Sequence, residues 1–159
     1  MLAIDYRWWV LLHLVGAFAF MGAHGVSIVV TFKVRKERDR EKIRSLLQLS
    51  GSTVITLYIS LALLLAGGIG GASQLHYWKY SWIRISLGLL IAITLIMGGM
   101  ARPYYQKIKE ATTMRPSGAP RISDEELAAK LASPVPLINA GLGFAALFAI
   151  LYLMIFKPQ

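Results

Sequence analysis

The sequence contains no cysteine, and few of its residues are charged. Without thiols the chain can form no disulfide, no thiolate-bound zinc or iron–sulfur centre and no cysteine nucleophile. Charged residues make up 16% of the 159 residues, whereas soluble domains contain about 25%. Together with 56% hydrophobic residues and a mean hydropathy of +0.56, these shortages predict an integral membrane protein.

Four apolar windows are long enough to cross a bilayer, whose hydrocarbon core of about 30 Å needs roughly 20 helical residues. They cover about 8–32, 46–70, 82–101 and 136–156, within a single membrane domain of residues 1–159. Two hydrophilic loops, 33–45 and 102–133, separate the first pair of windows and the last pair. Helices joined by short loops pack antiparallel most easily, so we predict an all-α polytopic membrane protein, an antiparallel bundle of four transmembrane helices.

Acidic residues are scarce, with 8 against 17 basic ones and a net charge of +9. Thirteen of the basic residues lie in the two hydrophilic loops. Basic loops stay on the cytoplasmic side, so we expect these loops inside, both termini outside, and a location in the bacterial cytoplasmic (inner) membrane. The loops would then lie against anionic lipid headgroups. Neither loop has the folded basic module or the interleaved aromatics of a nucleic-acid site, so we expect no nucleic-acid partner.

The segments between and beside the windows carry local signals. Asp5 precedes the first window and a basic block follows it, so we expect this window to remain as a span rather than to be cleaved as a signal peptide. Charges at helical spacing in 33–45 suggest that the first two helices extend beyond the bilayer. Ser123 and Glu126 form a capping-box pattern that predicts a short helix over about 124–132. The glycine run 67–71 predicts the outer end of the second helix.

Ionisable side chains inside a membrane are costly, so the two histidines of the first window are functional candidates. His13 and His24 are eleven residues apart, which leaves them about 20° from eclipsed and separated by roughly 16 Å along a helix. Phe20, Ser27 and Thr31 fall near the same line. We predict that this histidine stripe, defined as His13, Phe20, His24, Ser27 and Thr31, faces the interior of the bundle, because lipid would leave the imidazoles unsatisfied.

Two interpretations of the histidines are open. Neutral imidazoles could bind a metal or haem iron, or each could hydrogen-bond a neighbouring helix and specify packing alone. The sequence has only three histidines, too few for two bis-histidine haems. An outer haem could pair His13 with His76, and one at His24 would need Met97, Met100, another weak ligand or an open site. The candidate metal ligands are therefore His13, His24 and His76.

Arg84 is the one formal charge within the apolar windows. It can extend to the headgroups, or it can approach a haem propionate or a quinone oxygen beside His13 as a cofactor-binding residue. Methionines could add thioether ligands for Cu(I) at His24, so copper is a less favoured cofactor than haem b. No acidic residue lies within the windows, which disfavours proton-coupled transport.

The first window, from Trp9 through His13 and Gly16 to Gly22, His24 and Gly25, resembles predicted four-helix bacterial membrane proteins of unknown function. The segment Trp82-Ile-Arg84 and the closing Ile155-Phe156-Lys157-Pro158 are also similar to that group. The group is distantly similar to the copper-resistance D membrane domain and to the haem-binding membrane protoporphyrinogen oxidase. This resemblance implies that His13 is the first candidate for a cofactor ligand and His24 the second.

The resemblance also has departures. The haem-binding relatives carry a lysine where this chain has Arg84, and arginine does not readily lose a proton to act as a base. The copper-resistance relatives are larger.

Three hypotheses follow for the function. The first is haem b binding through the histidine stripe, with a redox or electron-transfer role. The second is a non-catalytic accessory subunit whose glycine-rich helix faces dock on membrane-protein partners or on a second copy of the chain. The third is copper handling. Whether the protein is an enzyme stays open at this point.

Overall fold

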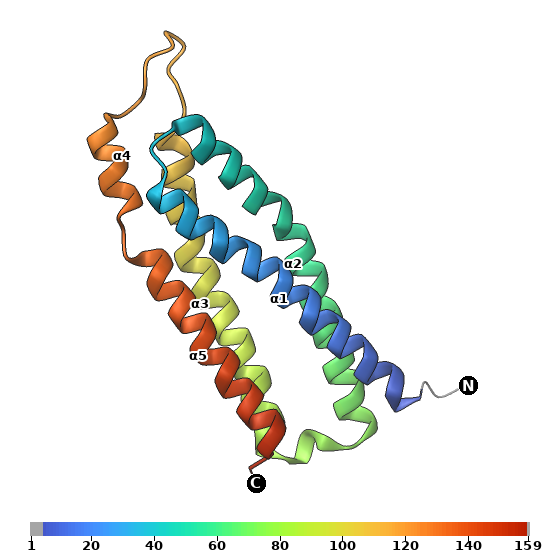
Figure 1. Ribbon diagram of the computed structural model, residues 1–159. Helices are drawn as coiled ribbons and strands as arrows, with labels where there is room; N and C mark the ends of the chain where they lie inside the picture. The colour runs from blue at the N-terminus through green and yellow to red at the C-terminus, as the bar shows by residue number, and fades with distance from the viewer. Residues whose placement is uncertain (1–4, 159) are drawn as a thin grey trace.

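The computed structural model describes residues 5–158, and this part of the chain is helical without any β-strand (Figure 1). Four helical segments are long and apolar enough to cross a membrane, which confirms the predicted fold class. The elements are α1 (Tyr6–Lys36), α2 (Arg40–Gln74), the 3-10 turn η1 (Tyr77–Lys79), α3 (Ser81–Ala111), α4 (Asp124–Leu131) and α5 (Val135–Phe156).

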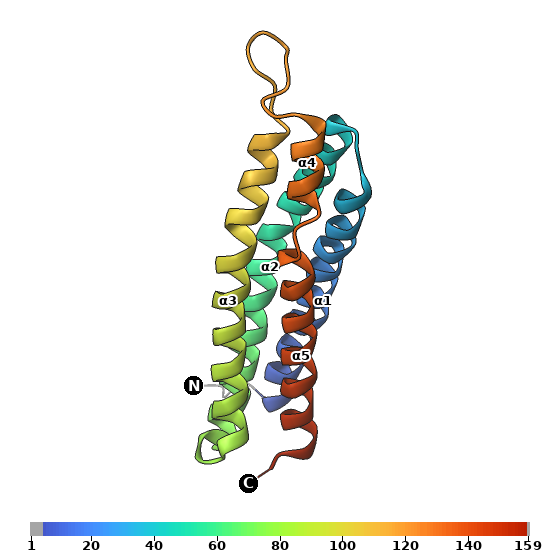
Figure 2. The same ribbon diagram turned by 90° about the vertical axis from the view of Figure 1, so that its left-hand side faces the viewer.

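The long helices form two antiparallel hairpins. α1 packs mainly on α2, and α3 packs mainly on α5, with few contacts between the hairpins. Figure 1 shows the hairpins together near α4 and diverging toward the opposite end. The start of α1 and the end of α5 lie at that opposite end, whereas α4 and the loop before it lie at the first (Figure 2). We call the α4 end the inner end, because it carries the two basic loops, and the opposite end the outer end.

Two glycines bring the backbones of α1 and α2 into contact. A Cβ atom at Gly16 would lie 2.8 Å from Leu64 Cα, and one at Gly67 would lie 2.7 Å from Trp9 O and His13 Cα. The prediction that the glycine run 67–71 ends the second helix is wrong, since α2 continues to Gln74. Glycine at these positions removes the side chain that would hold the two helices apart.

Side-chain caps define the helix ends near the inner loops. Asp39 Oδ1 accepts from the backbone N–H groups of Glu41 and Lys42 at 2.9 and 3.3 Å and starts α2. Ser123 Oγ accepts from the N–H of Glu126 at 3.1 Å, so the short helix predicted from the capping box is confirmed as α4. Because only residues 37–39 separate α1 from α2, both helices extend into the basic loop as expected.

α3 continues ten residues beyond the third apolar window, through Pro103 to Ala111. Proline has no N–H, so the carbonyl of Gly99 loses its helical partner at this point. The start of the hydrophilic segment 102–133 is therefore helical, and α3 has a weak point next to Gly98 and Gly99.

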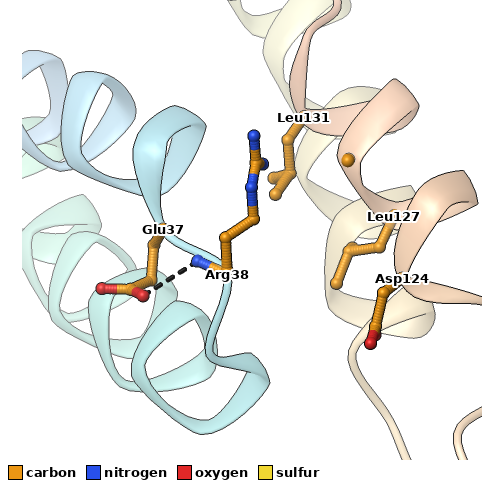
Figure 3. A pocket seen from close by; sticks show the side chains of 6 residues that line it. Glu37, Arg38, Asp124, Leu127 and Leu131 are labelled. Atoms are coloured by element: carbon orange, nitrogen blue, oxygen red, sulfur yellow. Dashed lines mark hydrogen bonds between the residues drawn. The ribbon is translucent and has the colours of Figure 1, made fainter.

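The inner end holds the densest apolar core of the described residues. Its buried members come from all helices except α5: Val30, Val34, Ile43, Ile108, Ala111, Leu127 and Leu131. Arg40 is 9% exposed and crosses this core, donating to the carbonyls of Ala111 and Ile122 at 2.9 and 2.8 Å. Figure 3 shows the adjacent surface hollow, which is lined by Glu37 and Arg38 on one side and by Asp124, Leu127 and Leu131 of α4 on the other. The hairpins are thus joined at the inner end.

Candidate functional site

A cavity of about 850 Å³ lies between the two hairpins, with walls from α1, α2, α3 and α5. The five residues of the histidine stripe, His13, Phe20, His24, Ser27 and Thr31, all line it. The prediction that the stripe faces the bundle interior is therefore confirmed. Most of the lining is apolar, as is usual for sites that bind small molecules or cofactors.

Near the middle of the cavity, a nitrogen of α1 and a sulfur of α3 lie against a glycine of α5. A Cβ atom at Gly143 of α5 would lie 3.2 Å from Met97 Sδ of α3 and 3.5 Å from His24 Nε2 of α1. The His24 nitrogen and the Met97 sulfur therefore both pack against Gly143. The Phe20 ring stacks on the His24 imidazole, with centroids 6.1 Å apart and an interplanar angle of 6°. This contact orients the imidazole.

His13 occupies the outer part of the cavity and is held by α2. Its Nδ1 lies 2.8 Å from the carbonyl oxygen of Leu64, which requires that Nδ1–H donates. In a neutral imidazole the proton is then on Nδ1, and Nε2 keeps its free electron pair. Helix packing and ligand binding are both compatible with this bond, because carbonyl oxygens commonly orient ligating histidines in this way.

The inner part of the cavity is more polar. Thr31 and Tyr105 share a hydrogen bond that joins α1 to α3, and Ser27 Oγ lies 3.5 Å from Thr53 Oγ1 of α2. Tyr104 and Asn139 in this part, and Ser86 near the outer end, each have a buried side-chain oxygen without a hydrogen-bond partner among the described residues. Such atoms are costly to bury.

Two cations lie at the inner mouth of the cavity. Arg102 and Lys109 of α3 line it, and the described lining includes no acidic residue. Arg102 Nη2 donates to Tyr58 Oη of α2 at 3.0 Å, so it links the hairpins along one side. In the sequence, these two residues are distinguished only as part of the basic loop that indicates the topology. Their spacing of seven residues places both side chains on one face of a helix, and this spacing is the sequence feature that could have predicted that both line the same site.

The other predicted site residues lie elsewhere. Arg84 is exposed on α3 and is absent from the cavity lining, and Met100 is also outside it. His76 is exposed at the start of η1, with φ of 56°, and does not line the cavity either. No cluster of three or more metal-binding His, Asp or Glu side chains occurs within residues 5–158. The structure thus brings His13 and His24 to one cavity, with Arg84 and His76 outside it.

Four membrane-length helices around an apolar cavity define a polytopic integral membrane protein. The chain belongs to the family described as "Predicted integral membrane protein (DUF2269)", whose model matches residues 8–158. That description states membrane integration and names no ligand or reaction. Comparison with curated proteins and with solved structures gave no match.

Proposed function

We propose that the protein binds haem b in the cavity between the hairpins, where His24 and Met97 would hold the iron, and serves in electron transfer. The observation that carries this proposal is the convergence of His24 Nε2 and Met97 Sδ at Gly143. Imidazole and thioether are an axial pair used by electron-transfer haem proteins. Bound haem would supply one-electron redox chemistry, and the protein would set its ligands and surroundings.

The residues present fit such a group in three respects. The absence of a side chain at Gly143 lets His24 and Met97 lie beside each other, since a Cβ there would lie 2.9 Å from Met97 Cε. The volume of about 850 Å³ falls in the range of cofactor sites, about 300–1,000 Å³. The apolar walls suit a macrocycle, and burial away from water tunes its potential.

His13, which the resemblance implies as the first candidate ligand, becomes the second candidate in this proposal. Its bond to Leu64 leaves Nε2 available as a ligand atom. We prefer His24 as the iron ligand because a methionine sulfur lies beside it. The hydrogen bond of His13 to Leu64 joins α1 to α2, which is sufficient to account for a histidine at that position.

An optical spectrum of the full-length protein, purified in detergent after expression with ample haem, tests this proposal. We expect a Soret band that is lost in His24→Ala. Met97→Leu should keep haem but change its spectrum and lower its midpoint potential, because a thioether ligand raises the potential. Met100→Leu, on the same helix but outside the cavity, is the matched control. A colourless protein, or a band unchanged by His24→Ala, would overturn haem binding at this site.

Copper handling is the second candidate function, because the same nitrogen and sulfur pair suits Cu(I). Stoichiometric copper that is lost in both His24→Ala and Met97→Leu, without a Soret band, would favour it. A colourless, metal-free protein that copurifies with a large membrane partner would favour an accessory subunit instead.

We further propose that the protein lies in the bacterial cytoplasmic membrane with both termini outside. The basic loops support this orientation, since thirteen Lys and Arg residues lie in the segments 33–45 and 102–133.

A further inference from the structure

We propose that the inner mouth of the cavity binds one anionic phospholipid of the cytoplasmic leaflet, with its phosphate on Arg102 and Lys109 and an acyl chain inside the cavity. This inference goes beyond haem binding and does not depend on it. Four features of the structure support it: the placement of charge, the opening between the hairpins, the free space along the lining, and the depth of the two cations.

The charge at the mouth has one sign. Arg102 and Lys109 line the cavity, and no Asp or Glu among the described residues does so. The two residues are seven apart on α3, so their side chains share one face about 10 Å apart along the axis. A phosphodiester between them would accept hydrogen bonds from a guanidinium and an ammonium group. A zwitterionic headgroup would bring a third cation to the same place.

The cavity can be reached from the bilayer. α2 and α3 belong to different hairpins and make few contacts with each other. The described side-chain bond between them at this level is that of Arg102 with Tyr58. An acyl chain that enters between these helices would meet mostly apolar walls, so it would exchange one apolar environment for another.

Two lining glycines leave room for that chain. A Cβ atom at Gly51 of α2 or at Gly98 of α3 would meet no other atom within 4 Å. Both residues line the cavity, on the two helices that flank the opening. A larger side chain at Gly51 or Gly98 could therefore fill this space without a clash with the protein.

The depth of the cations suits a headgroup. Arg102 follows the third apolar window directly, and Lys109 lies two helical turns further toward the inner end. A phosphate held by both would lie at the membrane surface, and its acyl chain would run toward the outer end along Gly98. Anionic lipids of the cytoplasmic leaflet approach a protein from this side.

Native mass spectrometry of the full-length protein without added haem tests the proposal. Phosphatidylglycerol and phosphatidylcholine with identical acyl chains are titrated separately. We expect a single phosphatidylglycerol adduct with at least tenfold higher affinity than phosphatidylcholine. Arg102→Gln with Lys109→Gln should weaken phosphatidylglycerol binding at least tenfold. Lys107→Gln is the charge control, since Lys107 is exposed on the same turns of α3 but does not line the cavity.

A second pair of variants tests the acyl chain and stays informative if the charge variant misfolds. Gly98→Leu should weaken phosphatidylglycerol binding at least fivefold by filling the cavity. Gly88→Leu, also on α3 with open space at its Cβ but outside the lining, should leave binding within twofold. Equal binding of both lipids, or equal effects of the paired variants, would overturn the proposal. A missing Soret band would count against haem binding alone.

Discussion

Arg40 of α2 and Asp124 of α4 form an ion pair across the hairpins, with 2.7 Å between Nη2 and Oδ1. The two residues are 84 positions apart in the chain. Asp124 remains 88% exposed, whereas Arg40 is 9% exposed and also donates to two backbone carbonyls. The carbonyl bonds, rather than the ion pair, should therefore provide most of the stability of this junction.

Arg40→Ala should lower the free energy of unfolding by about 2–3 kcal/mol, because it leaves the buried carbonyl of Ala111 and the half-buried carbonyl of Ile122 without their donor. Asp124→Ala should cost less, about 1 kcal/mol or below, since its carboxylate is solvated. Denaturant titration in detergent measures both values. Equal losses in the two variants would contradict this division.

Gly67→Ala should destabilise the first hairpin by about 1–3 kcal/mol, because the new methyl group would collide with the α1 backbone at Trp9 and His13. Gly22→Ala is the matched control, since a Cβ atom there meets nothing within 4 Å. It should be neutral or slightly stabilising, as alanine favours helix over glycine. Thermal unfolding in detergent compares the two. If Gly67→Ala were as stable as the control, α1 and α2 could move apart to accept the methyl group without a loss of stability.

Glu37 should contribute a pH-dependent part of the stability of the inner turn. The backbone N–H groups of Asp39 and Arg38 donate to its carboxylate and hold its pKa below the ordinary value of 4.5. The charged form is favoured in the folded state, so this contribution is present above pH 4.5 and is lost as the pH falls through the folded-state pKa.

Glu37→Gln should therefore melt at a lower temperature than wild type near neutral pH, and the difference should shrink as the pH falls below the ordinary glutamate pKa. Melting curves in detergent between neutral and acidic pH measure the difference. A difference in melting temperature that stays constant over this pH range would indicate that the charge of the carboxylate does not contribute to stability.

Membrane orientation can be mapped directly because the natural sequence has no cysteine. In intact bacterial cells, a membrane-impermeant maleimide should label Ser73→Cys, near the outer end of α2, and leave Ser117→Cys in the inner loop unlabelled. Permeabilised cells should show labelling of both variants. The reverse pattern would invert the proposed topology, and labelling of both in intact cells would point to damaged membranes or mixed orientation.

Local features of the fold were predictable from the sequence, because each rests on neighbouring residues. The lengths of the apolar windows predicted four membrane-length helices, and Ser123 with Glu126 predicted α4. Helical periodicity placed His13 and His24 on one face, and that face lines the cavity.

Contacts between residues of different helices could not be predicted from the sequence, because they depend on how the helices pack. Met97 was one of several possible partners of His24, and its position at Gly143 depends on how α3 and α5 pack. Gly67 was interpreted as a helix end because glycine often has that role, yet here the approach of α1 determines its use. Arg102 and Lys109 carry the same positive charge as other loop residues, and only the fold distinguishes them.

The junction at Arg40 also bears on the order of events during synthesis. α1 and α2 pack on each other through glycines within the first 74 residues, so their hairpin can form before the second hairpin has been made. The partners of Arg40 appear only when the chain has reached residues 111–124. α5, which completes the cavity walls, follows them. Any molecule that contacts all four walls must accordingly complete its contacts after α5 has entered the membrane.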